Sequence, residues 1–156
     1  MFDAPADTWY LWLGVATTSV LALGVAVALP STPPPDATAA ANTIDAVATS
    51  PHEATGEHAL DARQFKLGPH RVALRNDAGT AHADVAYGPV TPVREGSPLA
   101  SVLTGTPPER TFTNQSGFRK AARRARNQSQ RWERVERSLL VRRVTWGDVD
   151  VTLVGA

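Results

Sequence analysis

The chain of 156 residues contains no cysteine. Disulfide bonds, thiolate metal sites and cysteine nucleophiles are therefore excluded as sources of stability or chemistry. The sequence also has no glycine-rich run that would cradle a phosphate group and no serine within a nucleophile elbow. Because no catalytic constellation is present, we expect a protein that is not an enzyme and that needs no cofactor.

The four histidines are the residues that would most readily bind a metal ion. His52 and His58 are six residues apart, whereas the zincin pattern places two histidines four apart on one helix. His70 and His82 are expected on the two strands of one hairpin, where we interpret them as surface residues. The sequence therefore predicts no metal site.

Basic residues are absent from residues 1–62, which contain seven acidic residues. The rest of the chain holds all sixteen bases, fourteen of them arginine, against eight acids. The excess is greatest in residues 117–143, with ten bases and two acids. This asymmetry suggests an anionic partner or surface for the C-terminal part. The alternative is that these bases form a solvated helix face.

Residues 8–29 carry no charged side chain. A helix of this length would extend ~33 Å, which matches a hydrocarbon core of about 30 Å. Nine of its residues are Leu or Val, and Trp9, Tyr10 and Trp12 lie at one end, where aromatic side chains favour the headgroup layer. A cleaved signal peptide would begin with basic residues and have a shorter apolar core. We therefore predict a tail at residues 1–7 and a single-pass transmembrane helix at residues 8–29.

The side of the membrane depends on weaker signals. Neither flank of the apolar segment carries a nearby Lys or Arg, so the positive-inside rule gives no orientation. Asn114-Gln115-Ser116 and Asn127-Gln128-Ser129 are glycosylation sequons. They favour a cell-membrane protein whose soluble domain is extracellular.

A spacer and a short helix are predicted for residues 30–59. Prolines 33–35 cannot continue a helix, because each lacks an N–H and disfavours α geometry in the residue before it. Asp36 can then cap a new helix over residues 37–49. Its apolar stripe consists of Ala40, Ala41, Ile44, Val47 and Ala48. We interpret this segment as an alanine-rich stalk helix that packs on a soluble domain at residues 60–156.

Two hairpins are predicted in that domain. Residues 71–75 and 81–87 alternate in polarity around the turn residues 76–79, and residues 64–67 form a possible further strand. Residues 139–146 and 149–154 are rich in β-branched residues, and Gly147-Asp148 between them fits a type II′ turn. Residues 95–110 are expected to be mostly loop, with a helical turn at 99–103.

An amphipathic helix is predicted from residue 117 to residue 137. Its apolar stripe consists of Phe118, Ala121, Ala122, Ala125, Ser129 and Trp132. We expect Phe118 and Trp132 to be buried with residues of the last hairpin, namely Val144, Trp146, Val151 and Leu153. Because both aromatic residues lie on the apolar stripe, nucleic acid is not an expected partner. The candidate binding residues are the bases Arg119, Lys120, Arg123, Arg124, Arg126 and Arg131.

These elements predict an α+β protein. The expected architecture is an N-terminal transmembrane helix, a short stalk helix and a small antiparallel sheet of two hairpins, with one amphipathic helix packed against it.

The chain resembles a family of uncharacterised haloarchaeal single-pass membrane proteins. The N-terminal stretches that carry the resemblance are Met1-Phe2-Asp3-Ala4-Pro5, Thr8-Trp9-Tyr10, Pro33-Pro34-Pro35-Asp36 and Ala41-Asn42-Thr43-Ile44-Asp45. The later ones are Leu67-Gly68-Pro69-His70-Arg71, Gly79-Thr80-Ala81-His82, Gly88-Pro89-Val90, Leu140-Val141-Arg142-Arg143-Val144-Thr145-Trp146 and Val151-Thr152-Leu153-Val154.

The resemblance implies a pilin-like protein of a type IV pilus-like or secretion-like assembly. Because the N-terminal tail lacks the basic leader and processing site of true pilins, an accessory subunit is favoured over a major filament subunit. The first hypothesis is therefore a membrane-anchored structural subunit whose partners are the lipid bilayer and other membrane or pilin-like subunits. The alternative is an anchored domain that binds anionic lipid or polymer through its basic helix.

Overall fold

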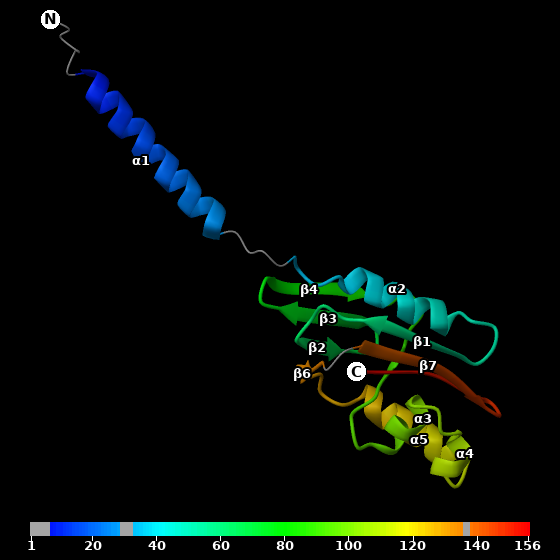
Figure 1. The fold of residues 1–156 in the computed structure, drawn as a ribbon. Coiled ribbons are helices and arrows are strands. Elements are labelled where there is room, and N and C mark those ends of the chain that lie inside the picture. Colours follow the sequence, from blue (N-terminus) through cyan, green and yellow to red (C-terminus); the bar gives the residue numbers. More distant parts are fainter. Residues whose placement is uncertain (1–6, 29–32, 136–137) are drawn as a thin grey trace, which may run out of the picture. The chain divides into compact units, whose positions relative to one another are not determined.

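The computed structural model describes residues 7–28, 33–135 and 138–156, and within the first of these ranges it describes side chains only at positions 9, 10 and 12–20. The chain forms two compact units, and the boundary between them lies between Pro33 and Pro34. The elements in chain order are α1 (Asp7–Ala28), α2 (Ala37–Ala48), β1 (Ala54–Ala59), β2 (Gln64–Leu67), β3 (Arg71–Asn76), β4 (Gly79–Asp84), β5 (Thr91–Pro92), α3 (Pro98–Leu103), α4 (Pro108–Thr111), α5 (Gln115–Arg126), β6 (Glu133–Arg134), β7 (Ser138–Trp146) and β8 (Val149–Gly155) (Figure 1).

The first unit contains α1, which forms where the uncharged segment predicts a helix. Over the residues that the structure describes, no helix combines the length and the apolar character needed to cross a membrane. The prediction of a transmembrane helix at 8–29, with the single-pass arrangement and the location in the cell membrane, is therefore contradicted. Three consecutive hydroxyl residues, Thr17 to Ser19, lie in the middle of α1 and reduce the gain from membrane insertion. Residues 1–6 and 29–32, which include most of the predicted tail and part of the spacer, lie outside the described residues.

The second unit is built on two four-stranded sheets. Sheet A has the strand order β1-β7-β8-β5, and sheet B has the order β4-β3-β2-β6. Neighbouring strands are antiparallel except β5 and β8, which pair in parallel. The α+β class and both hairpins are confirmed, but the expectation of one small sheet is wrong. The β7–β8 hairpin is the centre of sheet A, flanked by β1 and β5. In sheet B, β2 and β6 extend the β3–β4 hairpin on its β3 side only and leave β4 at the edge.

The β7–β8 turn has the predicted chemistry. Gly147 has φ +63°, and no non-glycine residue in the described chain has a positive φ, so the turn is type II′ rather than type I′. A Cβ on Gly147 would also fall 2.2 Å from Nε2 of Gln115, the first residue of α5. The positive φ of the turn therefore favours glycine at this position, and a larger residue would also displace the Gln115 side chain.

The first hydrophobic core lies between the two sheets and α2. Asp36 accepts a hydrogen bond from the Ala39 N–H (2.9 Å) and so caps α2 as predicted. The helix contacts strands of both sheets and buries Ile44 completely. On β1, Gly56 leaves room for this packing, since a Cβ there would lie 2.7 Å from Cγ2 of Val47. Residues 37–48 are therefore part of the domain core, and the description of α2 as a stalk is corrected.

The second core covers the opposite face of sheet A. Phe118 from α5 and Leu99 and Val102 from α3 pack there on side chains of β7 and β8. Of the predicted core residues, Phe118, Val144, Val151 and Leu153 are buried. Trp146 is only partly buried, with its ring centroid 6.2 Å from that of Phe118.

Trp132 does not belong to this core, because α5 ends at Arg126 rather than at residue 137. Beyond the helix the chain turns back and pairs with β2 as β6. Trp132 lies against sheet B, where the Arg75 guanidinium is 4.2 Å from its ring centroid, a cation–π contact. The apolar periodicity that continues past Arg126 therefore reflects a contact with a different sheet.

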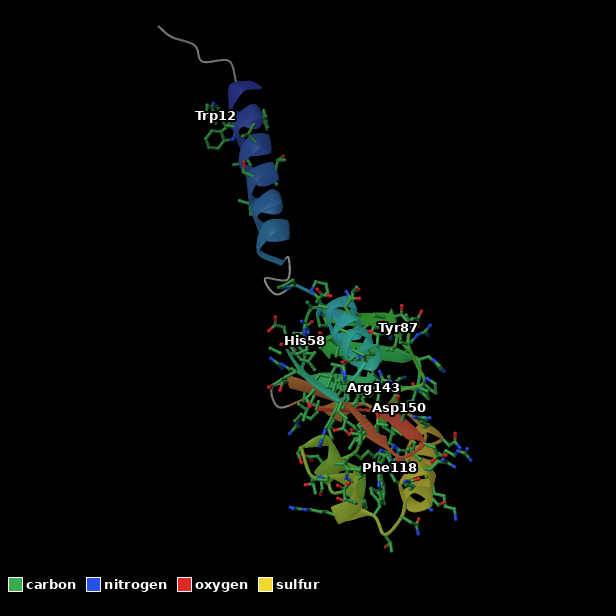
Figure 2. All side chains as sticks on the ribbon, turned by 90° about the vertical axis from the view of Figure 1, so that its right-hand side faces the viewer. Trp12, His58, Tyr87, Phe118, Arg143 and Asp150 are labelled. Carbon is green, nitrogen blue, oxygen red and sulfur yellow. The ribbon has the colours of Figure 1, made fainter. Side chains whose placement is uncertain are left out.

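Two consecutive arginines on β7 fix the ends of two helices. Arg142 points to one face of sheet A and donates a hydrogen bond to the Val102 carbonyl of α3 (2.6 Å). Arg143 points to the other face and donates to the Ala48 carbonyl of α2 (3.2 Å) and to the Ser50 carbonyl. Asp150 lies beside Arg143 (Figure 2), and their hydrogen bond raises the pKa of this guanidinium. Each cation thus satisfies carbonyls at a helix C-terminus, where positive charge is favourable.

The assignment of the two aromatic residues can be tested by substitution. Phe118→Ala is expected to lower the free energy of unfolding by about 3–5 kcal/mol, because the side chain is fully buried. Trp132→Ala should cost distinctly less, because this ring is only partly buried. Urea unfolding of the two variants provides the comparison. Equal losses would show that Trp132 is a core residue and that α5 is longer than described.

The capping role of the tandem arginines predicts a second stability effect. Arg142→Met keeps an apolar stem but removes the hydrogen bond to Val102, and about 1–2 kcal/mol of stability should be lost. Arg143→Met is also expected to destabilise the domain, and it removes the ion-pair partner of Asp150. Arg134→Met, at an exposed position of β6, is the matched control and should unfold like the unchanged protein. If all three variants have the same urea midpoint, the two guanidinium groups do not stabilise the helix ends.

Candidate functional site

Helix α5 carries most of the candidate binding residues, and three contacts hold it in place. Phe118 anchors its inner face in the second core. Arg119 forms an ion pair with Asp148 of the β7–β8 turn (2.6 Å). Near the C-terminal end, Nε of Arg126 donates a hydrogen bond to the hydroxyl of Thr91 (2.8 Å), which is completely buried. The helix is therefore held in its N-terminal half and at its last residue.

Arg119 and Arg126, two of the predicted binding residues, thus have structural roles. Burial lowers the pKa of the Arg126 guanidinium, and the nearby charge of Arg123 lowers it further. The hydrogen bond to Thr91 offsets part of the cost of placing this charge in a partly buried position. Neither side chain is free to engage a ligand without giving up its contact.

Three other bases point away from the domain and form what we call the basic face of α5, consisting of Lys120, Arg123 and Arg124. All three are exposed, and within the described part of the chain none of them has an ion-pair partner. Arg131, the remaining candidate, is exposed but lies beyond the end of the helix. The structure therefore brings together three of the six predicted residues on one surface.

A groove of about 590 Å³ runs beside the basic face. One wall is α5, which lines the groove with Gly117, Lys120, Ala121, Arg124 and Ala125 at helical spacing, and Gln128 continues this wall just beyond the helix. The opposite wall is the segment from Pro92 to Leu99. Phe112 also lines the groove. The α5 groove, defined by these residues, thus extends along the length of the helix.

Side-chain contacts hold the Pro92–Leu99 wall against the chain that follows α5. Arg94 pairs with Glu133 (3.3 Å), and its Nη2 donates to the Ser129 carbonyl beyond α5 (2.9 Å). On the same wall, the Ser97 hydroxyl donates to the Arg94 carbonyl (2.7 Å). The groove is therefore formed before any ligand binds, which lowers the ordering cost of binding.

His58 and two acids near the histidines have partners within the domain. Nδ1 of His58 lies 3.3 Å from the Thr43 hydroxyl of α2, and Glu57 accepts a hydrogen bond from Ser138. Asp84, near His82, instead forms an ion pair with Arg71 (2.7 Å) that lowers the pKa of its carboxyl group. Among the described residues, no group of three His, Asp or Glu side chains is placed to hold a metal ion.

Sequence reasoning found the bases of α5 but missed the wall from Pro92 to Leu99. This segment reads as loop because Pro92, Gly96 and Pro98 interrupt any regular pattern. A possible signal was the restricted backbone of the two prolines, which favours a stiff, extended chain. That stiffness alone does not indicate which surface the segment faces.

Comparison with known proteins provides one match. Neither the curated proteins nor the solved structures include one that matches this chain. Residues 3–144 match a protein family described as a family of unknown function, DUF7283. Because this match covers most of the sequence, the chain belongs to the DUF7283 family.

Proposed function

We propose that the domain is a non-enzymatic interaction module that binds an acidic protein partner through the basic face of α5. The observation that carries this proposal is the presence of three exposed bases on a rigidly held helix. Their guanidinium and ammonium groups have no acidic partner in the described chain. By contrast, Arg119, on the same helix, is already paired with Asp148. Positive charge is thus concentrated on the outward side of α5, where a partner can reach it.

The electrostatics of this face favour a protein partner with several carboxylates. Arginine can hold a carboxylate with two parallel hydrogen bonds, and lysine adds a point charge beside it. Exposed pairs of this kind contribute specificity and association rate more than affinity. In the pilus-like or secretion-like assembly that the resemblance implies, the acidic partner would be another subunit, and this protein would be an accessory component.

Binding of an anionic polymer is the competing function, because the same bases would neutralise phosphate or sulfate groups. Such binding follows charge density and shows little dependence on the shape of the surface. A protein partner also requires a defined contact surface, which the α5 groove supplies beside the bases. This difference favours the protein partner.

Charge reversal of the basic face tests the proposal. In the full-length protein, the triple variant K120E/R123E/R124E is expected to bind poly-glutamate about tenfold or more weakly, because three exposed attractions are lost. The variant R110E/R131E/R134E has the same net charge and exposed substitutions elsewhere, and it should retain most of the binding. Titration with labelled poly-glutamate at two salt concentrations gives both affinities.

Two outcomes would contradict the proposal. If both triple variants lose affinity equally, net charge rather than the α5 surface governs binding. If polyphosphate or anionic vesicles bind the unchanged protein much more tightly than poly-glutamate, the anionic polymer or lipid alternative replaces the protein partner. Melting temperatures of both variants should stay close to that of the unchanged protein, because the substituted side chains are exposed.

A further inference from the structure

The α5 groove combines an apolar floor with a basic rim. Its apolar lining, which we call the floor, consists of the buried Leu99 and of Phe112, Ala121 and Ala125, which are partly exposed. Lys120 and Arg124 stand one turn apart at the edge of the α5 wall. Glu95 is the single acid among the lining residues, and it lies on the opposite wall. The two walls therefore differ in charge, and the apolar floor lies between them.

From this arrangement we infer that the groove holds an extended acidic peptide segment that places one large apolar side chain on the floor. This inference rests on the proposed function and names the kind of partner. The carboxylates of the segment face Lys120 and Arg124, and its apolar side chain packs against Phe112 and Ala121. The opposite side of the segment approaches Glu95, where amide or basic groups fit better than acids.

The length of the groove favours a peptide over a small molecule. The lining residues of α5 run from Gly117 to Ala125, which corresponds to about 12 Å of helix. An extended chain of about four residues covers that distance. The volume of about 590 Å³ is also within the range of ligand sites. The space around Gly96 is open to a peptide, because even a Cβ at this position would meet no atom within 4 Å.

Helix α5 supplies its own control for the charge part of this inference. Lys120 and Arg124 line the groove, whereas Arg123 is exposed on the same basic face but does not line it. The three bases are close in sequence and have similar exposure. Charge removal at Arg124 and at Arg123 therefore compares a base that lines the groove with an exposed base that does not.

Two labelled peptides and the full-length protein provide the test. Both peptides carry four carboxylates, and the central residue is leucine in one and serine in the other. The leucine peptide is expected to bind about tenfold or more tightly, because its apolar side chain is removed from water when it packs on the groove floor. Arg124→Gln should weaken both peptides several-fold, and Arg123→Gln should weaken them less.

Filling the groove should remove the preference for leucine. Ala121→Phe adds bulk to the floor, and both peptides should then bind with the affinity of the serine peptide. Because Ala121 packs partly against the second core, Gln128→Trp, at an exposed lining position, provides an independent obstruction with the same expected result. Melting temperatures show whether either variant alters folding.

The results separate this inference from the proposed function. Equal affinity for the two peptides, with loss of both in the charge-reversed triple variant, would overturn the groove inference and leave the basic face as an acidic-partner site. No binding of either peptide or of poly-glutamate would overturn both. Self-association of the unchanged protein that disappears in Ala121→Phe and in Gln128→Trp would assign the groove to a second copy and overturn the peptide.

Discussion

Strand β7 must bury both of its faces, and most of the domain depends on this constraint. One face contributes Leu139 and Val141 to the core shared with sheet B and α2. The other contributes Val144 to the core beneath α3 and α5. Since successive side chains of a strand point to opposite faces, neighbouring residues of β7 belong to different cores. A shift of one residue in its pairing would exchange the two sets and disrupt both.

Because of the same alternation, the side chains of Arg142 and Arg143 contact different helices. One guanidinium reaches the end of α3 and the other the end of α2, so a single strand orients helices on both sides of sheet A. The turn after β7 then meets α5 through Asp148 and Arg119. The exposed bases of α5 are therefore held on a fixed element rather than on a mobile loop, and the groove beside them is bounded by side-chain contacts. A preformed surface of this kind loses less entropy on binding than a flexible one.

Local chemistry was sufficient to predict the helix after Asp36 and the two hairpins. Their caps and turns depend on a few neighbouring residues, such as Gly147, whose φ is +63°. Strand β1 was missed because its sequence is polar and has few β-branched residues, and because its partner β7 is about eighty residues further along the chain. Non-local pairing of this kind overrides weak intrinsic preference.

The sequence did not predict which bases of the candidate site are accessible, and the cause is related. The charge pattern identified six bases, but it did not distinguish those that point outward from those that serve packing. Arg126 is partly buried and donates a hydrogen bond to Thr91, and only the fold brings these two residues together. Likewise, Trp132 continues the apolar period of α5 although it lies against sheet B. The apolar periodicity and the charge pattern of the sequence describe the surface of a helix. Which part of that surface remains accessible depends on the elements that pack against it.

The separation of charge along the sequence explains why the basic face remains unneutralised. Acids of the first 62 residues mostly accept hydrogen bonds from uncharged donors: Asp36 from a helix N–H, Asp45 from two backbone N–H groups and Glu57 from a hydroxyl. In the described chain, all five ion pairs instead draw their carboxylates from later residues, namely Asp77, Asp84, Glu133, Asp148 and Asp150. That later part has sixteen bases for eight acids, so internal pairing cannot neutralise all of its arginines. Because the inner side of α5 is committed to packing, the excess charge is left on its outer side, where an acidic partner can neutralise it.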